Sequence, residues 1–195
     1  MPSGPKINES KTLTLYFDLD RYKKVLDAFA SGLEMRVEKS QDISNVHSVA
    51  SFFISRIDVE VDTQLGNQPD LKGLAAIANA IMAYEAYLEF EKSDRWQKLL
   101  AHGGRLQRPL WASTGVKDPS YDDTRYVMEL VAPHTVNTMP QSTLDAVLDH
   151  GKFHGNTITP AIEKSHVVMA QLAKTGVSLN SITDTLEVDG VASFS

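Results

Sequence analysis

The sequence predicts an α/β protein in which helices cover the outer face of a parallel sheet. Short segments rich in β-branched and aromatic residues alternate along the chain with longer segments whose apolar residues recur every three or four positions. Such alternation is typical of parallel sheets, either doubly wound or closed as a (β/α)8 barrel. The sequence has no GxGxxG and no GxxxxGK(S/T) motif, so nothing supports a doubly wound nucleotide-binding sheet. Polar residues at the predicted strand ends favour the barrel.

Length and composition limit the class of protein further. With 195 residues the chain can bury a sizeable core as one domain, but it is shorter than the roughly 250 residues usual for a (β/α)8 barrel. Hydrophobic residues at 42% and charged residues at 23% are typical of a globular protein, and the net charge of -6 argues against binding to nucleic acid or an anionic membrane. The absence of cysteine excludes disulfides, thiolate metal sites and a cysteine nucleophile.

Membrane and metal signals are weak. No segment approaches the roughly 18 consecutive apolar residues of a membrane span, and residues 1–11, MPSGPKINESK, contain no apolar signal core. We therefore expect a cytoplasmic protein. His150 and His154 stand four positions apart, but Gly151 and Gly155 make a helical ligand pair unfavourable. We expect no metal.

The first predicted elements form two strand–helix units. Residues 12–17, TLTLYF, are short, β-branched and aromatic, which favours a strand. A helix is expected over residues 18–39, where apolar side chains stand three and four positions apart. Residues 46–53, VHSVASFF, form a nearly continuous apolar run, as in a strand that is covered on both faces. A short helix over residues 55–66 follows, and its final glycine can end it.

Two helices and a third strand follow in the middle of the chain. Residues 71–91 carry a long apolar stripe at helical spacing. Ser93 is a suitable N-cap for a short helix that extends to about His102, where two glycines end it. Residues 108–113, RPLWAS, form the third predicted strand.

The last part of the chain is predicted to be mainly helical. Residues 134–139, HTVNTM, are a candidate for a very short fourth strand. Amphipathic patterns then predict helices near residues 140–149, 160–175 and 180–188, separated by Gly and Asn.

Hydroxyl, amide and basic residues recur at the carboxyl ends of the predicted strands. They are Ser51 and Arg56, Ser113 and Lys117, and Asn137 and Thr138. In a (β/α)8 barrel these ends surround the active site. A cation four or five positions after a hydroxyl could bind phosphate, because the cation neutralises charge while the hydroxyl donates a hydrogen bond. The alternative is that Arg56 pairs with Asp58 or Glu60, and Lys117 with Asp118, on the surface; the pattern alone does not choose.

Three extended motifs in this order resemble the transaldolase family, in its longer bacterial subfamily. They are VHSVASFFISRIDVEVD, QRPLWASTGVKDPSYDDTRYVMELVAPHTVNTMP and TLDAVLDHG, and the likeness extends from about Thr12 to Phe194. The resemblance implies a TIM barrel, a (β/α)8 fold, of which residues 1–195 form the carboxyl-terminal portion with strands five to eight and their outer helices. Residues 1–11 would then be a disordered or non-native start.

The resemblance also implies an activity. Transaldolases move a dihydroxyacetone unit from sedoheptulose 7-phosphate to glyceraldehyde 3-phosphate, giving erythrose 4-phosphate and fructose 6-phosphate. They act through a lysine Schiff base in the pentose phosphate pathway, without metal or organic cofactor. By the same resemblance Ser51, Arg56 and Ser113 bind substrate phosphate, Lys117 is a second cation for it, and Thr14 holds the catalytic water. Thr12 stands where the family usually has Asn.

The Schiff-base lysine of the family belongs to a Lys-Ile-Pro-Ala-Thr segment on the fourth strand, and this sequence contains no such segment. Lys6, in KINES, lacks the apolar strand of that motif, and Lys117 follows a glycine turn on a predicted loop, where an amine is hard to keep neutral. We therefore expect the chain to be inactive alone. Its expected partners are sugar phosphates, the missing half of the barrel, or further copies through open barrel edges. The alternative is a non-catalytic remnant or subunit that binds sugar phosphate or a partner chain.

A few further residues are predicted to be structural. Trp96 and Trp111 are expected in the core, because large aromatic side chains stabilise mainly by burial. His47 lies in an apolar run and is expected to be a buried, hydrogen-bonded histidine. Asp58 and Asp62 are expected to be solvated charges on a helix face.

Overall fold

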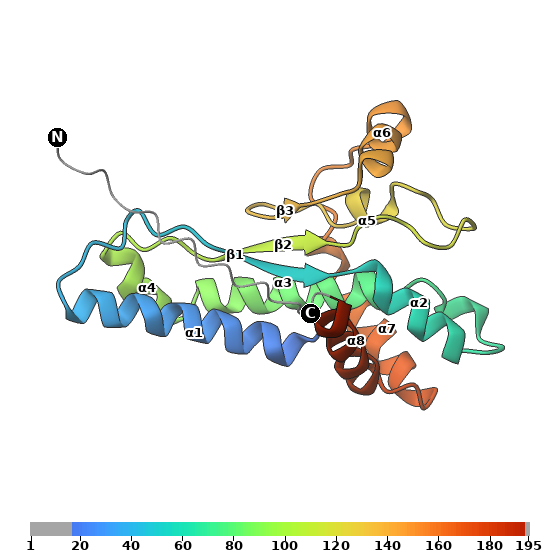
Figure 1. The fold of residues 1–195 in the computed structure, drawn as a ribbon, viewed down its shortest axis with the longest axis horizontal. Coiled ribbons are helices and arrows are strands. Elements are labelled where there is room, and N and C mark those ends of the chain that lie inside the picture. The colour runs from blue at the N-terminus through green and yellow to red at the C-terminus, as the bar shows by residue number, and fades with distance from the viewer. Residues whose placement is uncertain (1–16, 194–195) are drawn as a thin grey trace.

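Three parallel strands lie at the centre of the fold (Figure 1). The structure, a computed structural model, describes residues 17–193. The strands are β1 (Val49–Phe53), β2 (Arg108–Ala112) and β3 (Val136–Asn137), in the order β1-β2-β3. They correspond to the second, third and fourth predicted strands, each shorter than predicted. The first predicted strand lies outside the described residues except for Phe17, which is not in a strand.

The register of the sheet separates two faces. Val49 pairs with Arg108 and Phe53 with Ala112, and β3 joins β2 through the pairing of Leu110 with Val136. Side chains alternate along each strand, so every second residue points to the same face. The outer face is buried beneath helices and includes Ala50, Phe52 and Trp111. The other face, with Val49, Phe53 and Leu110, is half-buried or exposed, as expected for a barrel wall whose opposite side is open.

The predicted helices are all present, with ends within a few residues of the prediction except that the last one, α8, extends five residues further. They are α1 (Leu19–Glu38), α2 (Ser55–Gln64), α3 (Ala75–Glu91), α4 (Asp94–Ala101), α5 (Arg125–Met128), α6 (Gln141–His150), α7 (Ile162–Lys174) and α8 (Leu179–Ser193), with 3-10 turns at Pro69–Leu71 and Thr159–Ala161. Ser93 caps α4 as predicted, because its hydroxyl accepts a hydrogen bond from the Trp96 N–H at 3.2 Å. The short helix α5 was not predicted.

The main core lies between the outer face of the sheet and α3. Helix α3 is buried on nearly all sides, with α1, α2 and α7 packed around it. Rings of Tyr22, Phe52 and Trp111 meet edge to face, with centroids 5.9 and 6.2 Å apart, and the Trp111 indole donates to the Leu130 carbonyl at 3.0 Å. Trp96 is also buried, so the core prediction for both tryptophans is confirmed.

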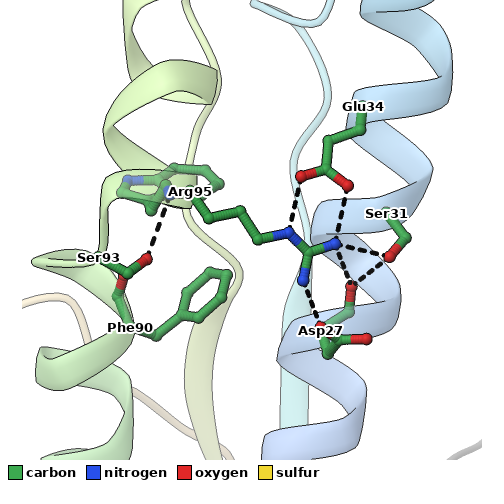
Figure 2. A network of polar contacts seen from close by, with 7 residues as sticks. Asp27, Ser31, Glu34, Phe90, Ser93 and Arg95 are labelled. Carbon is green, nitrogen blue, oxygen red and sulfur yellow. Dashed lines mark hydrogen bonds and ion pairs between the residues drawn. The ribbon is translucent and has the colours of Figure 1, made fainter.

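Arg95 joins α4 to α1 across a smaller second cluster of apolar residues (Figure 2). Its guanidinium donates to both oxygens of Glu34, at 2.7 and 2.8 Å, and to the Ser31 hydroxyl at 2.7 Å. It also pairs with Asp27, one turn earlier on α1. This bidentate geometry fixes the two helices relative to each other.

Helix α6 stands away from the body of the fold (Figure 1). Leu148 on this helix is 76% exposed, Phe153 just after it is 74% exposed, and Leu144 is also exposed. Leu144 and Leu148 are four positions apart and so lie on the same side of the helix, and exposed apolar side chains grouped in this way are typical of a surface that another element or chain covers.

Candidate functional site

The carboxyl ends of β1 and β2 are joined side by side. The ladder continues past both strands, because the Ile54 N–H donates to the Ala112 carbonyl and the Ser55 N–H to the Ser113 carbonyl, each at 3.0 Å. The two serine hydroxyls then lie 3.1 Å apart. The segments that follow β1 and β2, which contain Arg56 and Lys117, therefore start from one point on the edge of the sheet.

The two predicted serines occupy different positions. Ser113 follows β2 directly and adopts a left-handed conformation with φ of 55°, which is uncommon for a residue other than glycine and turns the chain sharply. Ser51 lies in the middle of β1, not at its end as predicted, on the half-exposed face that includes Val49 and Phe53. Its hydroxyl therefore belongs to the barrel side of the sheet.

Arg56 is exposed in the first turn of α2. No side chain caps this turn, so Arg56 stands at the positive end of the helix dipole, next to the edge of the sheet. The ion pairs formed within residues 17–193 include neither Arg56 nor Lys117. The interpretation of these cations as surface ion pairs with Asp58, Glu60 or Asp118 is therefore wrong.

Lys117 lies at a cavity of about 510 Å³ between α2 and residues 113–124, the loop that follows β2. Ser55 and Lys72 also line this cavity, which is within the size range of small-molecule sites. Arg56 does not line it, because Arg56 points about 100° away from Ser55 around the helix axis. The structure thus places Ser55 and Lys117 on one cavity and Ser113 in contact with Ser55, whereas Arg56 lies outside this cavity.

Two carboxylates form the inner wall of this cavity. Asp58 is 2% exposed and accepts hydrogen bonds from the Ala76 N–H at 2.8 Å and the Tyr126 hydroxyl at 2.7 Å. Burial raises the pKa of Asp58 to about 6, against the opposing effect of these hydrogen bonds. Asp62 accepts from the Gly73 N–H at 2.8 Å and the Tyr121 hydroxyl at 2.7 Å. The prediction that Asp58 and Asp62 are solvated charges is wrong, and both tyrosines are partners that the sequence analysis missed.

Asn137 and Thr138 have a structural role at this edge. The Thr114 hydroxyl contacts the Asn137 side-chain oxygen at 2.9 Å and the Thr138 carbonyl at 3.0 Å, and the Thr138 N–H donates to the Trp111 carbonyl at 2.9 Å. These bonds join the start of the loop after β2 to β3. Thr14, predicted to hold a water, lies outside the described residues.

A larger hollow, of about 780 Å³, lies at the opposite ends of the strands. Ser48, Arg108 and His134 line it, next to the amino ends of β1, β2 and β3. It contains none of the predicted site residues. Volume alone therefore does not identify the site in this fold, and the chemistry favours the carboxyl ends of the strands.

Between residues 17 and 193 no group of three or more His, Asp or Glu side chains could hold a metal ion. No helix in the same range is long and apolar enough to cross a membrane.

Comparison with known proteins assigns the family. The family model described as Transaldolase/Fructose-6-phosphate aldolase matches residues 8–195. The chain belongs to this family. Its members are TIM barrels, and the three parallel strands with their outer helices form part of such a barrel.

Curated relatives are close in sequence and about twice as long. The chain is 49% identical over 191 residues to a transaldolase of Mycobacterium tuberculosis (strain ATCC 25618 / H37Rv). This alignment covers 95% of the chain and 51% of the relative. It is 50% identical over 190 residues to transaldolases of Parafrankia sp. (strain EAN1pec) and Thermobifida fusca (strain YX), covering 95% of this chain and 52% of each relative. The chain therefore spans about half the length of these relatives, and the matched half is the carboxyl-terminal one.

Proposed function

We propose that this chain is the phosphate-binding part of a transaldolase. The complete enzyme would transfer dihydroxyacetone from sedoheptulose 7-phosphate to glyceraldehyde 3-phosphate through a lysine Schiff base, in the pentose phosphate pathway. One observation supports the proposal most strongly. The hydroxyls of Ser55 and Ser113 lie 3.1 Å apart, so the segment after β1 that contains Arg56 and the segment after β2 that contains Lys117 begin next to each other at one edge of the sheet. Two cations without carboxylate partners in the described chain can then neutralise one dianionic phosphate.

The proposed phosphate ligands are Ser51, Arg56, Ser113 and Lys117. Arg56 is the main one, because guanidinium binds phosphate through two parallel N–H groups and Arg56 stands in the first turn of α2, at the positive end of the helix dipole. Asp58 and Asp62 repel an anion from the inner wall of the cavity, which favours binding at its rim. We propose Thr14 as a holder of the catalytic water by family resemblance.

The amine that forms the Schiff base is proposed to lie outside this chain. Such a lysine must be neutral to attack a carbonyl, which requires a desolvated position near other cations. Lys117 is exposed on a loop and therefore lacks such a desolvated position. Phosphate binding is the role that this setting supports.

A complementary half of the barrel is the proposed partner. Within residues 17–193 the outer edge of β3 has no paired strand, and the face with Val49 and Leu110 is only partly covered. Edges and faces of this kind pair with other chains. A second candidate is a non-catalytic subunit that binds sugar phosphate or a partner chain, which the partly covered face of the sheet also favours.

We also propose a cytoplasmic location, because charged sugar phosphates cross membranes only at high cost and are processed where they are made.

The test of the phosphate site is an NMR titration of the chain with inorganic phosphate, which measures the binding affinity. Arg56→Ala should weaken binding by roughly 1.5 to 3 kcal/mol, the value of a charge-assisted hydrogen bond, and Lys117→Ala should weaken it less, because an ammonium group is less directional. Lys98→Ala, an exposed lysine on α4, is the matched control and should change nothing. Unchanged binding in both Arg56→Ala and Lys117→Ala would reject the phosphate site.

A further inference from the structure

Two carboxylates on one face of α2 hold the loop after β2. Asp62 accepts the Tyr121 hydroxyl and Asp58 the Tyr126 hydroxyl, both at 2.7 Å. The second oxygen of each carboxylate accepts a backbone N–H at 2.8 Å, from Gly73 in the α2–α3 connection for Asp62 and from Ala76 in the first turn of α3 for Asp58. We call Asp58, Asp62, Tyr121 and Tyr126 the carboxylate–tyrosine clamp. Each carboxylate binds two separate segments to α2.

Arg125 packs against both tyrosine rings of the clamp. Its guanidinium lies 4.4 Å from the centre of the Tyr121 ring and 5.2 Å from that of Tyr126, and it donates to the Gly73 carbonyl. Gly73 has φ of 68°, and a Cβ at this position would lie 2.7 Å from the guanidinium and 2.8 Å from the Tyr121 ring. The loop and the α2–α3 connection are therefore in close contact, so moving the loop would break several contacts at once.

The clamp and the strand ends fix both ends of the segment that contains Lys117. Ser113 is fixed by its contact with Ser55, and Tyr121 by Asp62. Lys117 lies midway between these points, exposed and without an ion pair among residues 17–193. An anion bound by a lysine on a mobile loop must order both the loop and the side chain, whereas a loop that is already fixed lowers this entropy cost.

The two halves of the clamp differ in burial. The hydrogen bond between Asp58 and Tyr126 is buried and belongs to the core, whereas the bond between Asp62 and Tyr121 is only partly buried, at the wall of the cavity that Lys117 also lines. Loss of the second bond can therefore release the loop without removing the core packing of the first.

We propose that Asp62 and Tyr121 are positioning residues for the phosphate site: their hydrogen bond holds the loop so that Lys117 stays beside the first turn of α2. The inference rests on the proposed role of Lys117 in phosphate binding. Neither residue touches the phosphate; both act through Lys117.

The test is the affinity of the chain for inorganic phosphate, measured by NMR titration in four variants. Tyr121→Phe removes one hydroxyl and keeps the ring beneath Arg125, and it should weaken binding about five- to tenfold, because the binding-competent loop is then populated only part of the time. Asp62→Asn keeps one oxygen to accept the Gly73 N–H, and its amide nitrogen can donate to the Tyr121 hydroxyl, so the loop stays attached. Because it also removes a negative charge, it should bind phosphate at least as well as the parent chain. Tyr84→Phe is the matched control, because it removes a hydroxyl bond to the Pro133 carbonyl of 3.0 Å far from the loop; its affinity should not change.

The fourth variant separates positioning from general destabilisation. In a Lys117→Ala background, Tyr121→Phe should have no further effect on phosphate affinity, because the hydroxyl acts only through Lys117. Equal losses with and without Lys117, or an unchanged affinity in Tyr121→Phe alone, would overturn the inference while leaving the phosphate site in place. If the parent chain binds no phosphate, the proposed function fails at this site and the inference fails with it.

Discussion

Asp58 gives the protein a pH dependence of stability that one substitution can isolate. Burial raises the pKa of this carboxyl from 3.8 to about 6; Asp62 also raises it, while Tyr126, the Ala76 N–H and Arg125 oppose the change. Because the folded-state pKa is the higher one, the native state binds more protons than the unfolded state between about pH 4 and about pH 6. The free energy of unfolding therefore falls as the pH rises through this window. The difference between 3.8 and about 6 corresponds to roughly 3 kcal/mol.

Asp58→Asn removes this dependence because the amide is neutral throughout. Its oxygen can accept the Ala76 N–H and its nitrogen can donate to the Tyr126 hydroxyl, so the fold should be kept. We expect the stability of the parent chain minus that of Asp58→Asn to fall by roughly 3 kcal/mol between about pH 4 and about pH 7.

Urea denaturation measures this difference, at one fixed protein concentration because self-association would change the apparent stability. Subtracting the stability of Asp58→Asn from that of the parent chain cancels the pH dependence of groups that both proteins share, such as Glu34. Its hydrogen bonds with Arg95 lower its pKa, so its stabilisation is instead lost as the pH falls. A difference that stays flat across the window would show that Asp58 does not sit as a buried carboxyl, and would refute the reasoning.

Three further predictions follow from packing and exposure. Gly73→Ala should destabilise the fold by roughly 2 kcal/mol more than Gly66→Ala in thermal denaturation, because both have positive φ but only a Cβ at Gly73 meets other atoms; equal losses would count against the tight clamp. Arg95→Met should cost about 1 kcal/mol at low salt and less at high salt, since its partners are partly exposed, and a loss independent of salt would exclude the ion-pair explanation. The chain should self-associate in sedimentation velocity, less so with Leu148→Glu, because the Leu148 side chain is 76% exposed; a monomer at every concentration would contradict the open-edge account.

Most of the fold could be predicted from local sequence patterns. Long amphipathic helices such as α1 and α3 were found because their apolar residues repeat over several turns. Strand limits were less accurate, because an apolar run does not reveal where pairing begins: β1 starts only at Val49, so His47 lies before the strand and is exposed rather than buried. Helix α5 has only four residues, one of which is Tyr126 of the clamp, so it is too short for any periodicity to show it.

The sequence predicted which residues belong to the candidate site, but not which side chains contact one another there. Arg56 and Lys117 were found because cations follow hydroxyl residues near strand ends, and Ser113 lies directly after its strand. The sequence could not show that Ser55 is the residue that meets Ser113, or that the carboxylates of α2 bind tyrosines 59 and 68 positions away. Such pairs depend on how two strand–helix units dock, and that geometry is set by the whole sheet.

The central claim is that this chain supplies phosphate binding while the amine that forms the Schiff base comes from residues outside it. The most direct measurement is to incubate the purified chain with fructose 6-phosphate and borohydride, which traps an imine as a stable amine, and to map any adduct by mass spectrometry. The same reaction is then run with a fragment containing the amino-terminal half of the Thermobifida fusca relative, which is 50% identical over the shared part. The account predicts no adduct on this chain in either reaction and an adduct on the added fragment. A stoichiometric adduct on Lys117 in the chain alone would contradict it.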